Sequence, residues 1–201
     1  MGFIAVDGAP RTGKTLIMTK LGYEDYSISK HQIFANYKCN FAQVVTIQRM
    51  LTMPFDEMDR DYKTLLIQEA DKIFDRLRTT SEPNRLLRSL TGQSGKRNLS
   101  IIYDTQYLNK VDTSLTYYTD IVIKTASYID ASTKEPICFE YTFCKYDGQE
   151  ITKIIKTIRI PTVFMRYPID YYKLYDTYAH TMPIWDYEMV KGDINDELDA
   201  I

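Results

Sequence analysis

The sequence has no long apolar run, and it has few of the residues that bind zinc or form disulfides. No stretch reaches the roughly 18 to 20 apolar residues that a membrane-spanning helix requires, and the short apolar run near the start lacks a signal-peptide cleavage site. The three cysteines, an odd number, and the two histidines lack the spacing of metal ligands. We therefore expect a cytoplasmic protein in a reducing compartment, with no membrane span and no zinc site.

The sequence also lacks a large excess of charge of either sign. Its formal net charge of −2 argues against a protein coated in basic surface, but it permits a local basic patch. The segment from Lys72 to Lys110 contains eight Lys or Arg residues and three acids. Residues 186–201 contain six acids and one lysine. We therefore expect a basic middle and an acidic C-terminal tail.

Length and apolar content predict a single α/β domain over residues 1–201. A chain of 201 residues with 44% apolar side chains can bury one core, and it contains no internal repeat. Predicted strands alternate with predicted helices, which favours a mainly parallel sheet covered on both faces, with residues 1–128 as the core. The predicted strands span residues 3–6, 32–38, 64–67, 99–103 and 121–126. The predicted helices begin near residue 14 and span residues 42–51 and 81–93.

After Pro136 the pattern changes to that of antiparallel structure. Two strand-like runs flank Asp147 and Gly148, a dipeptide typical of hairpin turns, so residues 137–160 are expected to form a β-hairpin extension. Residues 168–180 are predicted to form an amphipathic terminal helix whose tyrosines pack on the sheet.

One motif carries a specific chemistry. The segment GAPRTGKT matches G-x-x-x-x-G-K-[ST], and it lies between a predicted strand and a predicted helix, as the motif requires. Backbone N–H groups of such a loop and the positive end of the helix bind phosphate oxygens. Lys14 is expected to neutralise the β and γ oxygens of ATP, and Thr15 to bind Mg²⁺. The expected nucleotide-binding residues are Gly8, Ala9, Pro10, Arg11, Thr12, Gly13, Lys14 and Thr15, of which Arg11 is expected to face solvent.

The segment LLIQEAD, residues 65–71, has the apolar run and acidic end of the strand that completes an ATPase site. In such a strand an aspartate supports the Mg²⁺ shell, and the glutamate after it polarises the attacking water. Glu69 occupies the general-base position. Gln68 replaces the aspartate and offers the metal only a neutral amide oxygen, so weak turnover is expected. Asp71 is either a substitute base or a residue of the first turn of the next helix.

The predicted strand at residues 99–103 leads into Asp104, Thr105 and Gln106. If this strand neighbours the first strand, Gln106 lies beside the γ-phosphate and is a candidate sensor. A loop amide that caps a turn explains Gln106 equally well on spacing alone.

These features together resemble the FtsK/HerA superfamily of P-loop ATPases, and most of all the small genome-packaging ATPases of archaeal viruses and their Zot-like relatives. The resemblance covers roughly residues 2–128. It rests on the P-loop, the strand ending in Glu69, the helix at residues 84–93, the segment GKRNLSIIYDTQYLNKVD and the strand start TDIV.

The resemblance implies a P-loop fold with an additional strand, in which the five parallel strands follow the order 5-1-4-3-2. It implies ATP hydrolysis with Mg²⁺, assembly into a ring, usually a hexamer, and translocation of double-stranded DNA. Lys14 and Thr15 match the family's phosphate and metal residues, Glu69 its catalytic base, and Gln106 its sensor.

The family's arginine that acts across the subunit boundary falls near Gly95 in this sequence. Arg97 is the candidate, with Arg88 behind it. This basic cluster equally suits a solvated face or contact with DNA phosphates.

We interpret the sequence as that of a viral packaging ATPase in the host cytoplasm. Its ring would pump double-stranded DNA, without reading bases, into a preformed capsid, with a capsid or portal-vertex protein as partner. The alternatives are a Zot-like ATPase that assembles or exports virion protein, a small P-loop nucleotide kinase, and a nucleotide-binding scaffold that lost hydrolysis through Gln68.

Overall fold

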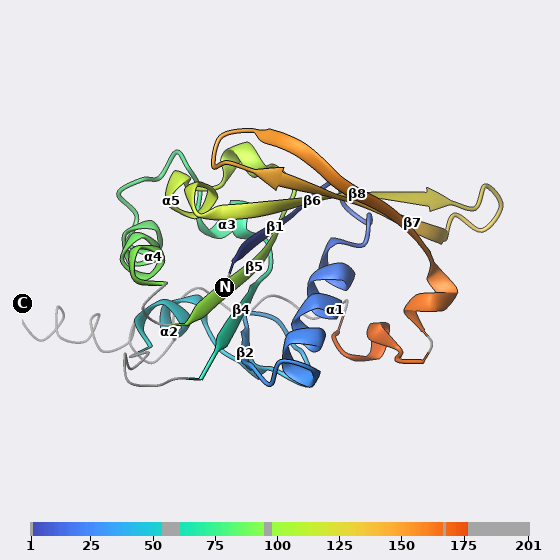
Figure 1. Cartoon of the computed structure of the whole chain (residues 1–201), viewed down its shortest axis with the longest axis horizontal. Helices are drawn as coiled ribbons and strands as arrows, with labels where there is room; N and C mark the ends of the chain where they lie inside the picture. Colours follow the sequence, from blue (N-terminus) through green and yellow to red (C-terminus); the bar gives the residue numbers. More distant parts are fainter. Residues whose placement is uncertain (1, 54–60, 95–97, 167, 177–201) are drawn as a thin grey trace, which may run out of the picture.

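The computed structural model describes residues 2–53, 61–94, 98–166 and 168–176, and its strands form one sheet in the order β3-β2-β4-β5-β1-β6-β7-β8 (Figure 1). The strands are β1 (Phe3–Asp7), β2 (Gln32–Ala35), β3 (Gln43–Val44), β4 (Lys63–Ile67), β5 (Leu99–Thr105), β6 (Thr119–Ile129), β7 (Pro136–Tyr146) and β8 (Ile151–Pro161). The α-helices are α1 (Lys14–Ser27), α2 (Ile47–Thr52), α3 (Ala70–Ile73), α4 (Glu82–Gln93) and α5 (Thr113–Tyr117), and the 3-10 helices are η1 (Leu108–Lys110), η2 (Thr162–Met165) and η3 (Tyr171–Lys173).

The centre of the sheet is parallel, and one edge is antiparallel. β1 pairs in parallel with β5 and β6, and β4 pairs in parallel with β5 and β2. The five parallel strands predicted from the sequence therefore keep the expected order. The complete order is longer because β3 adds a strand at one edge and the antiparallel β7 and β8 add two at the other.

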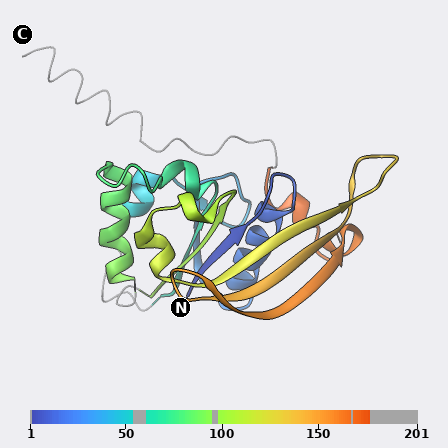
Figure 2. The same ribbon diagram turned by 90° about the horizontal axis from the view of Figure 1, so that it is seen from above.

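Different elements cover the two faces because side chains alternate along each strand. On β4, Leu65 and Ile67 point into one core and Leu66 points into the other. The first core lies under α2, α4 and α5, and the second under α1 and the C-terminal segment, on opposite sides of the sheet in Figures 1 and 2. Within the described ranges, no helix combines the length and apolar character needed to cross a membrane.

The predicted hairpin extension is confirmed, and it is longer than expected. β6 pairs in parallel with β1 along one edge and in antiparallel fashion with β7 along the other, and its pairing with β7 continues beyond the end of β1. β7 then pairs with β8, so the three long strands extend past the parallel strands in Figure 2. Phe139 and Tyr141 of β7 are buried in the same core as α1. The extension therefore packs against α1 together with the parallel strands.

The helix predicted at residues 42–51 is wrong in its first half. Gln43 and Val44 form the short strand β3 against β2, and the helix α2 begins only at Ile47. The β-branched residues of the run Val44-Val45-Thr46 favour extended backbone. Thr46 then caps α2, because its hydroxyl accepts a hydrogen bond from the backbone N–H of Arg49 (3.2 Å).

The terminal helix predicted at residues 168–180 is also wrong as far as the structure describes it. Up to residue 176 this segment contains only the short 3-10 helix η3, while residues 177–180 and the predicted acidic tail at 186–201 lie outside the described ranges. The backbone N–H of Asn40 donates to the carbonyl of Leu174 (2.9 Å), and Tyr175 forms a β-bridge with Cys39. These backbone contacts hold the segment extended. Tyr171 nevertheless packs on α1, where its ring lies edge-on to Tyr23.

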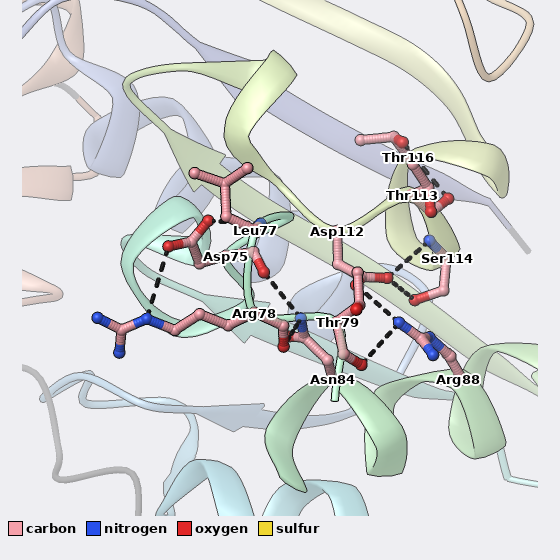
Figure 3. A network of polar contacts seen from close by, with 10 residues as sticks. All are labelled: Asp75, Leu77, Arg78, Thr79, Asn84, Arg88, Asp112, Thr113, Ser114 and Thr116. Atoms are coloured by element: carbon pink, nitrogen blue, oxygen red, sulfur yellow. Dashed lines mark hydrogen bonds and ion pairs between the residues drawn. The ribbon is translucent and has the colours of Figure 1, made fainter. Parts of the chain in front are cut away.

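A polar network joins α4 to α5 and to the segment after α3 (Figure 3). The buried carboxylate of Asp112 accepts hydrogen bonds from the guanidinium of Arg88 (3.2 Å) and from the backbone N–H and hydroxyl of Ser114 (2.9 and 2.6 Å). Arg88 also donates to the carbonyl of Thr79 (2.9 Å). Because an isolated buried carboxylate is costly, Arg88 stabilises the folded chain.

We expect Arg88→Leu to lower the free energy of unfolding by about 1 to 3 kcal/mol, because it removes a charged donor from the buried Asp112. The matched control is Arg78→Leu, which removes a largely exposed ion pair with Asp75 and should change stability by less than about 0.5 kcal/mol. Urea denaturation measures both values. Equal effects of the two substitutions would contradict the structural role of Arg88.

Candidate nucleotide-binding site

The P-loop, residues 8–15, connects the carboxyl end of β1 to the first turn of α1. Because β1 pairs with β5 and β5 pairs with β4, the carboxyl ends of all three strands meet at this loop. The backbone N–H of Gly8 donates to the carbonyl of Thr105 (3.3 Å), which ties the loop to β5. The carboxyl edge of a parallel sheet is the usual place for a ligand site. The structure therefore brings Gln68, Glu69 and Gln106 to the P-loop from distant parts of the sequence.

Gly13 allows the loop to turn into α1. Its φ is +81°, and a Cβ atom there would lie 2.7 Å from Tyr141 Oη and 2.8 Å from Phe139 Cδ1. Both rings belong to β7, and Tyr141 Oη also donates a hydrogen bond to the carbonyl of Gly13 (3.3 Å). The loop is therefore packed against the hairpin extension. Arg11 is exposed.

Lys14 spans the loop that it ends. Its Nζ donates to the carbonyls of Gly8 and Ala9, both at 2.9 Å. Partial burial lowers the pKa of Lys14, and nearby carboxylates, chiefly those of Asp104 and Asp71, oppose that shift. The ammonium group is thus held inside the concave side of the loop, where phosphate oxygens are bound in loops of this kind.

Thr15 lies between the ends of β4 and β5. Its hydroxyl donates to Asp104 Oδ2 (2.8 Å), and the side-chain amide of Gln68 lies 3.4 Å from the Thr15 oxygen. Asp104 is buried, and this burial raises its pKa to about 6, although the hydrogen bonds from Glu69 and Thr15 oppose the rise. A carboxylate therefore does reach the P-loop threonine, but it comes from β5 and not from β4.

Glu69 has an unusual backbone conformation at the end of β4. Its φ is +59°, a left-handed conformation that costs a non-glycine residue about 1 to 2 kcal/mol. The backbone N–H of Glu69 donates to Asp104 Oδ1 (2.6 Å), and its carboxylate pairs with Lys72 (2.6 Å). Asp71, the alternative base, lies in the first turn of α3. These contacts fix the peptide of Glu69 and occupy its side chain.

Gln106 lies just beyond β5, beside the P-loop. The turn that follows β5 is capped by Thr105, whose hydroxyl accepts a hydrogen bond from the backbone N–H of Tyr107 (3.1 Å). Within the described residues the amide of Gln106 makes no hydrogen bond. The turn is thus capped without Gln106, which leaves this amide available to a ligand.

The arginine candidates are in different situations. Arg97 lies outside the described residues. The guanidinium of Arg88 is bonded to Asp112 and Thr79 of its own chain. The intrachain contacts of Arg88 favour a structural role for this residue.

A cleft of about 1130 Å³ adjoins the P-loop on the side of β6 and α5. Asp7, Gln106, Tyr107 and Lys124 line both this cleft and a smaller hollow of about 300 Å³ at the start of the P-loop. Asp7 and Lys124 form an ion pair between β1 and β6. No role was predicted for Lys124 or Asp104 from the sequence. In both cases the available signal was a charged residue directly after a mostly apolar run, residues 121–123 for Lys124 and residues 99–103 for Asp104.

The site has the donors that a magnesium nucleotide requires. Thr15 supplies a hydroxyl, Gln68 an amide and Asp104 a carboxylate, all at the end of the loop. Asp71 Oδ1 is buried and has no hydrogen-bond partner among the residues that the structure describes. Oxygen ligands of this kind suit Mg²⁺. In the part of the chain that the structure describes, no three His, Cys, Asp or Glu side chains are grouped to hold a metal by themselves. Phosphate oxygens would therefore have to complete the shell.

No protein-family model matches the chain, and no curated protein matches it. Solved structures do match. The N-terminal domain of zonular occludens toxin from Neisseria meningitidis has a TM-score of 0.56 and 12% identity, over 87% of this chain and 98% of that chain. A second solved structure, an ATPase domain, has a TM-score of 0.50 and 8% identity, over 80% of this chain and 81% of that chain.

A third match is the genome packaging NTPase B204 from Sulfolobus turreted icosahedral virus 2, solved in complex with AMP. Its TM-score is 0.49 and its identity 13%, over 78% of this chain and 98% of that chain. Identities this low show the fold alone. The first two matches confirm the P-loop ATPase fold predicted from the sequence, and the resemblance to Zot-like proteins holds at the level of the fold.

We expect Asp104→Asn to stabilise the nucleotide-free protein at about pH 8 by up to about 3 kcal/mol, because a shift of one pKa unit corresponds to about 1.4 kcal/mol. An unfolded aspartate titrates near about pH 4. The folded protein holds the Asp104 proton more tightly, with a pKa of about 6, so ionisation destabilises the folded state above that pH and the cost vanishes below about pH 4.

Denaturation at about pH 8 and about pH 4.5 measures the difference, and the gain should shrink at the lower pH. Asp120→Asn is the matched control, because Asp120 lies at the amino end of β6, away from the loop, and is exposed. A variant of Asp104 that is less stable than the parent at the higher pH would show that burial of the carboxylate is not costly here.

Proposed function

We propose that the protein is a viral genome-packaging ATPase that acts in the host cytoplasm, a homo-oligomeric ring motor that hydrolyses ATP and moves double-stranded DNA into a preformed capsid. The observation that carries this proposal is the convergence at one P-loop of Lys14, Thr15, Glu69 and Gln106, the four residues for which the sequence resemblance implies roles in nucleotide binding and hydrolysis. Lys14 and Thr15 lie in the first turn of α1, Glu69 follows β4, and Gln106 follows β5.

In this proposal the backbone N–H groups of the loop and of the first turn of α1 bind the phosphates. Lys14 exchanges its bonds to the loop carbonyls of Gly8 and Ala9 for bonds to phosphate oxygens, which neutralises part of their charge. A bound Mg²⁺ would supply charge neutralisation at the β and γ oxygens, and Thr15, Gln68 and Asp104 would hold it.

Glu69 accepts the proton of the attacking water, and Gln106 donates a hydrogen bond at the γ-phosphate. Glu69 is paired with Lys72 in the structure, so its carboxylate must leave this partner before it can act as a base. The ion pair is partly exposed, and pairs of this kind contribute less than about 1 kcal/mol. Breaking the ion pair between Glu69 and Lys72 therefore adds only a small free-energy cost to catalysis.

DNA would contact basic side chains through its phosphates. Three exposed arginines lie on residues 76–85, a segment that ends in the first turn of α4: Arg76, Arg78 and Arg85. Phosphate contacts need only a local positive charge, which agrees with a net charge of −2. A portal-vertex or capsid protein would complete the packaging assembly.

Two other functions fit parts of the site. A Zot-like ATPase that assembles or exports virion protein would use the same nucleotide chemistry. A small P-loop nucleotide kinase is favoured by one observation, the cleft of about 1130 Å³ beside the loop, which has room for a phosphate acceptor.

We expect double-stranded DNA to stimulate ATP turnover at least tenfold, with a stimulation that falls as salt rises, because the contacts are to phosphates. Released phosphate is measured with double-stranded DNA, virion protein or nucleosides added in separate reactions. Lys14→Ala should lose nucleotide binding and serves as the control for contaminating ATPase. Stimulation by virion protein alone would favour the Zot-like function, and phosphate transfer to a nucleoside would favour a kinase.

Glu69→Gln should bind ATP within about threefold of the parent protein and lose turnover at least a hundredfold, because the amide cannot accept the proton of water. Binding is measured with a fluorescent ATP analogue and chemistry by single-turnover hydrolysis. Asp71→Asn is the matched comparison, a neutralised carboxylate two residues away. If Asp71→Asn loses turnover and Glu69→Gln keeps it, the base is Asp71.

A further inference from the structure

We propose that Asp104 takes the place of the aspartate missing at position 68, and that its carboxylate holds Thr15 and the water shell of the nucleotide-bound Mg²⁺. This inference rests on the proposed nucleotide site and assigns within it a role that the motifs in the sequence do not indicate. Neither the P-loop pattern nor the strand ending in Glu69 includes this residue.

The register of the sheet places Gln68 beside Asp104. β4 and β5 are parallel, and Ile67 pairs with Tyr103 in the last matched position, so Gln68 and Asp104 follow at equivalent positions on adjacent strands. Leu66 and Ile102, two residues earlier on each strand, belong to the core that packs on α1. Because side chains alternate, Gln68 and Asp104 are directed to the same face, where Thr15 lies in the first turn of α1.

Asp104 is in direct contact with Thr15. Asp104 Oδ2 accepts the Thr15 hydroxyl proton at 2.8 Å, whereas the Gln68 amide is 3.4 Å from the same oxygen. A hydroxyl that donates to a carboxylate keeps its oxygen lone pairs for another partner, such as a cation. The nearer group is also the one with a negative charge. Asp104 can therefore orient Thr15 and stabilise the metal shell, which a neutral amide does only weakly.

The carboxylate of Asp104 also holds the backbone of the proposed base, Glu69. Its other oxygen, Oδ1, accepts the backbone N–H of Glu69 at 2.6 Å, and Glu69 has a left-handed backbone at that position. One side chain thus contacts both the P-loop threonine and the peptide of the base. The unsatisfied, buried Asp71 Oδ1 is a further polar atom of this region that lacks a partner in the described chain. A buried polar atom without a partner is rare unless a water or an ion completes it.

The test compares nucleotide affinity with and without Mg²⁺, so that it does not depend on turnover. A fluorescent ATP analogue is titrated in excess Mg²⁺ and in EDTA, for the parent chain and for Asp104→Asn. We expect the parent to bind the analogue more tightly in Mg²⁺ than in EDTA, and we call the ratio of these two affinities the Mg²⁺ gain. In Asp104→Asn the Mg²⁺ gain should be about 10- to 100-fold smaller, which is the usual effect of removing a group that orients a metal ligand. In EDTA the affinity of Asp104→Asn for the analogue should stay within about threefold of the parent's, because Asn keeps an acceptor for the Glu69 N–H.

A compensating variant makes the test specific. Gln68→Glu places a carboxylate at the side chain that already lies 3.4 Å from Thr15, so the double variant Asp104→Asn with Gln68→Glu should recover part of the Mg²⁺ gain. Asp120→Asn, which neutralises an exposed aspartate at the amino end of β6, should leave the gain unchanged. Bound Mn²⁺, counted by electron paramagnetic resonance in the presence of the analogue, gives an independent readout of the metal.

The outcomes separate this inference from the proposed function. A full Mg²⁺ gain in Asp104→Asn overturns the role of Asp104 and leaves the nucleotide site intact. A parent chain that binds no nucleotide in either buffer overturns both. Thermal melts verify that each variant is folded, and Asp104→Ser, which also removes the charge and keeps an acceptor oxygen, replaces Asp104→Asn if that variant does not fold.

Discussion

The arrangement of the site depends on two hydrogen bonds to one buried carboxylate, that of Asp104. It accepts the hydroxyl of Thr15 at the start of α1 and the backbone N–H of Glu69 at the end of β4. β5 lies between β1 and β4 in the sheet, so a side chain at its carboxyl end can reach both neighbours. A negative charge at this depth destabilises the folded chain, and groups with such a raised pKa are concentrated at functional sites.

The hairpin extension belongs to the environment of the P-loop. β6 lies between β1 and β7 in the sheet, parallel to β1 and antiparallel to β7, so β7 continues the sheet beside the loop. Phe139 and Tyr141 then leave no room for a side chain at position 13, and Tyr141 bonds to the loop backbone. The phosphate-binding loop is therefore held between α1 on one side and the extension on the other. A rigid cradle of this kind loses little entropy when it binds a ligand.

Much of the fold could be predicted because it follows from local patterns. The alternation of apolar strands and helices indicated a parallel α/β sheet, and the Asp-Gly pair between two strand-like runs indicated the hairpin. The prediction was wrong in two places. Residues 43 and 44 pair with β2, close by in the sequence, where β-branched residues favour extended backbone over a helix. Tyr175 forms a bridge with Cys39, which is a long-range contact. Helical spacing of side chains cannot reveal a backbone partner more than a hundred positions away.

The amino-acid sequence was sufficient to indicate the P-loop as the candidate phosphate-binding loop, because that chemistry resides in the backbone N–H groups and one lysine of eight consecutive residues. It also indicated Glu69, Gln68 and Gln106 as candidates, since each lies at the end of a recognisable strand. The acid that reaches Thr15 could be found only in the folded chain. Asp104 is 89 positions from Thr15 in the sequence, and the contact exists because strand order and register place the end of β5 against the start of α1.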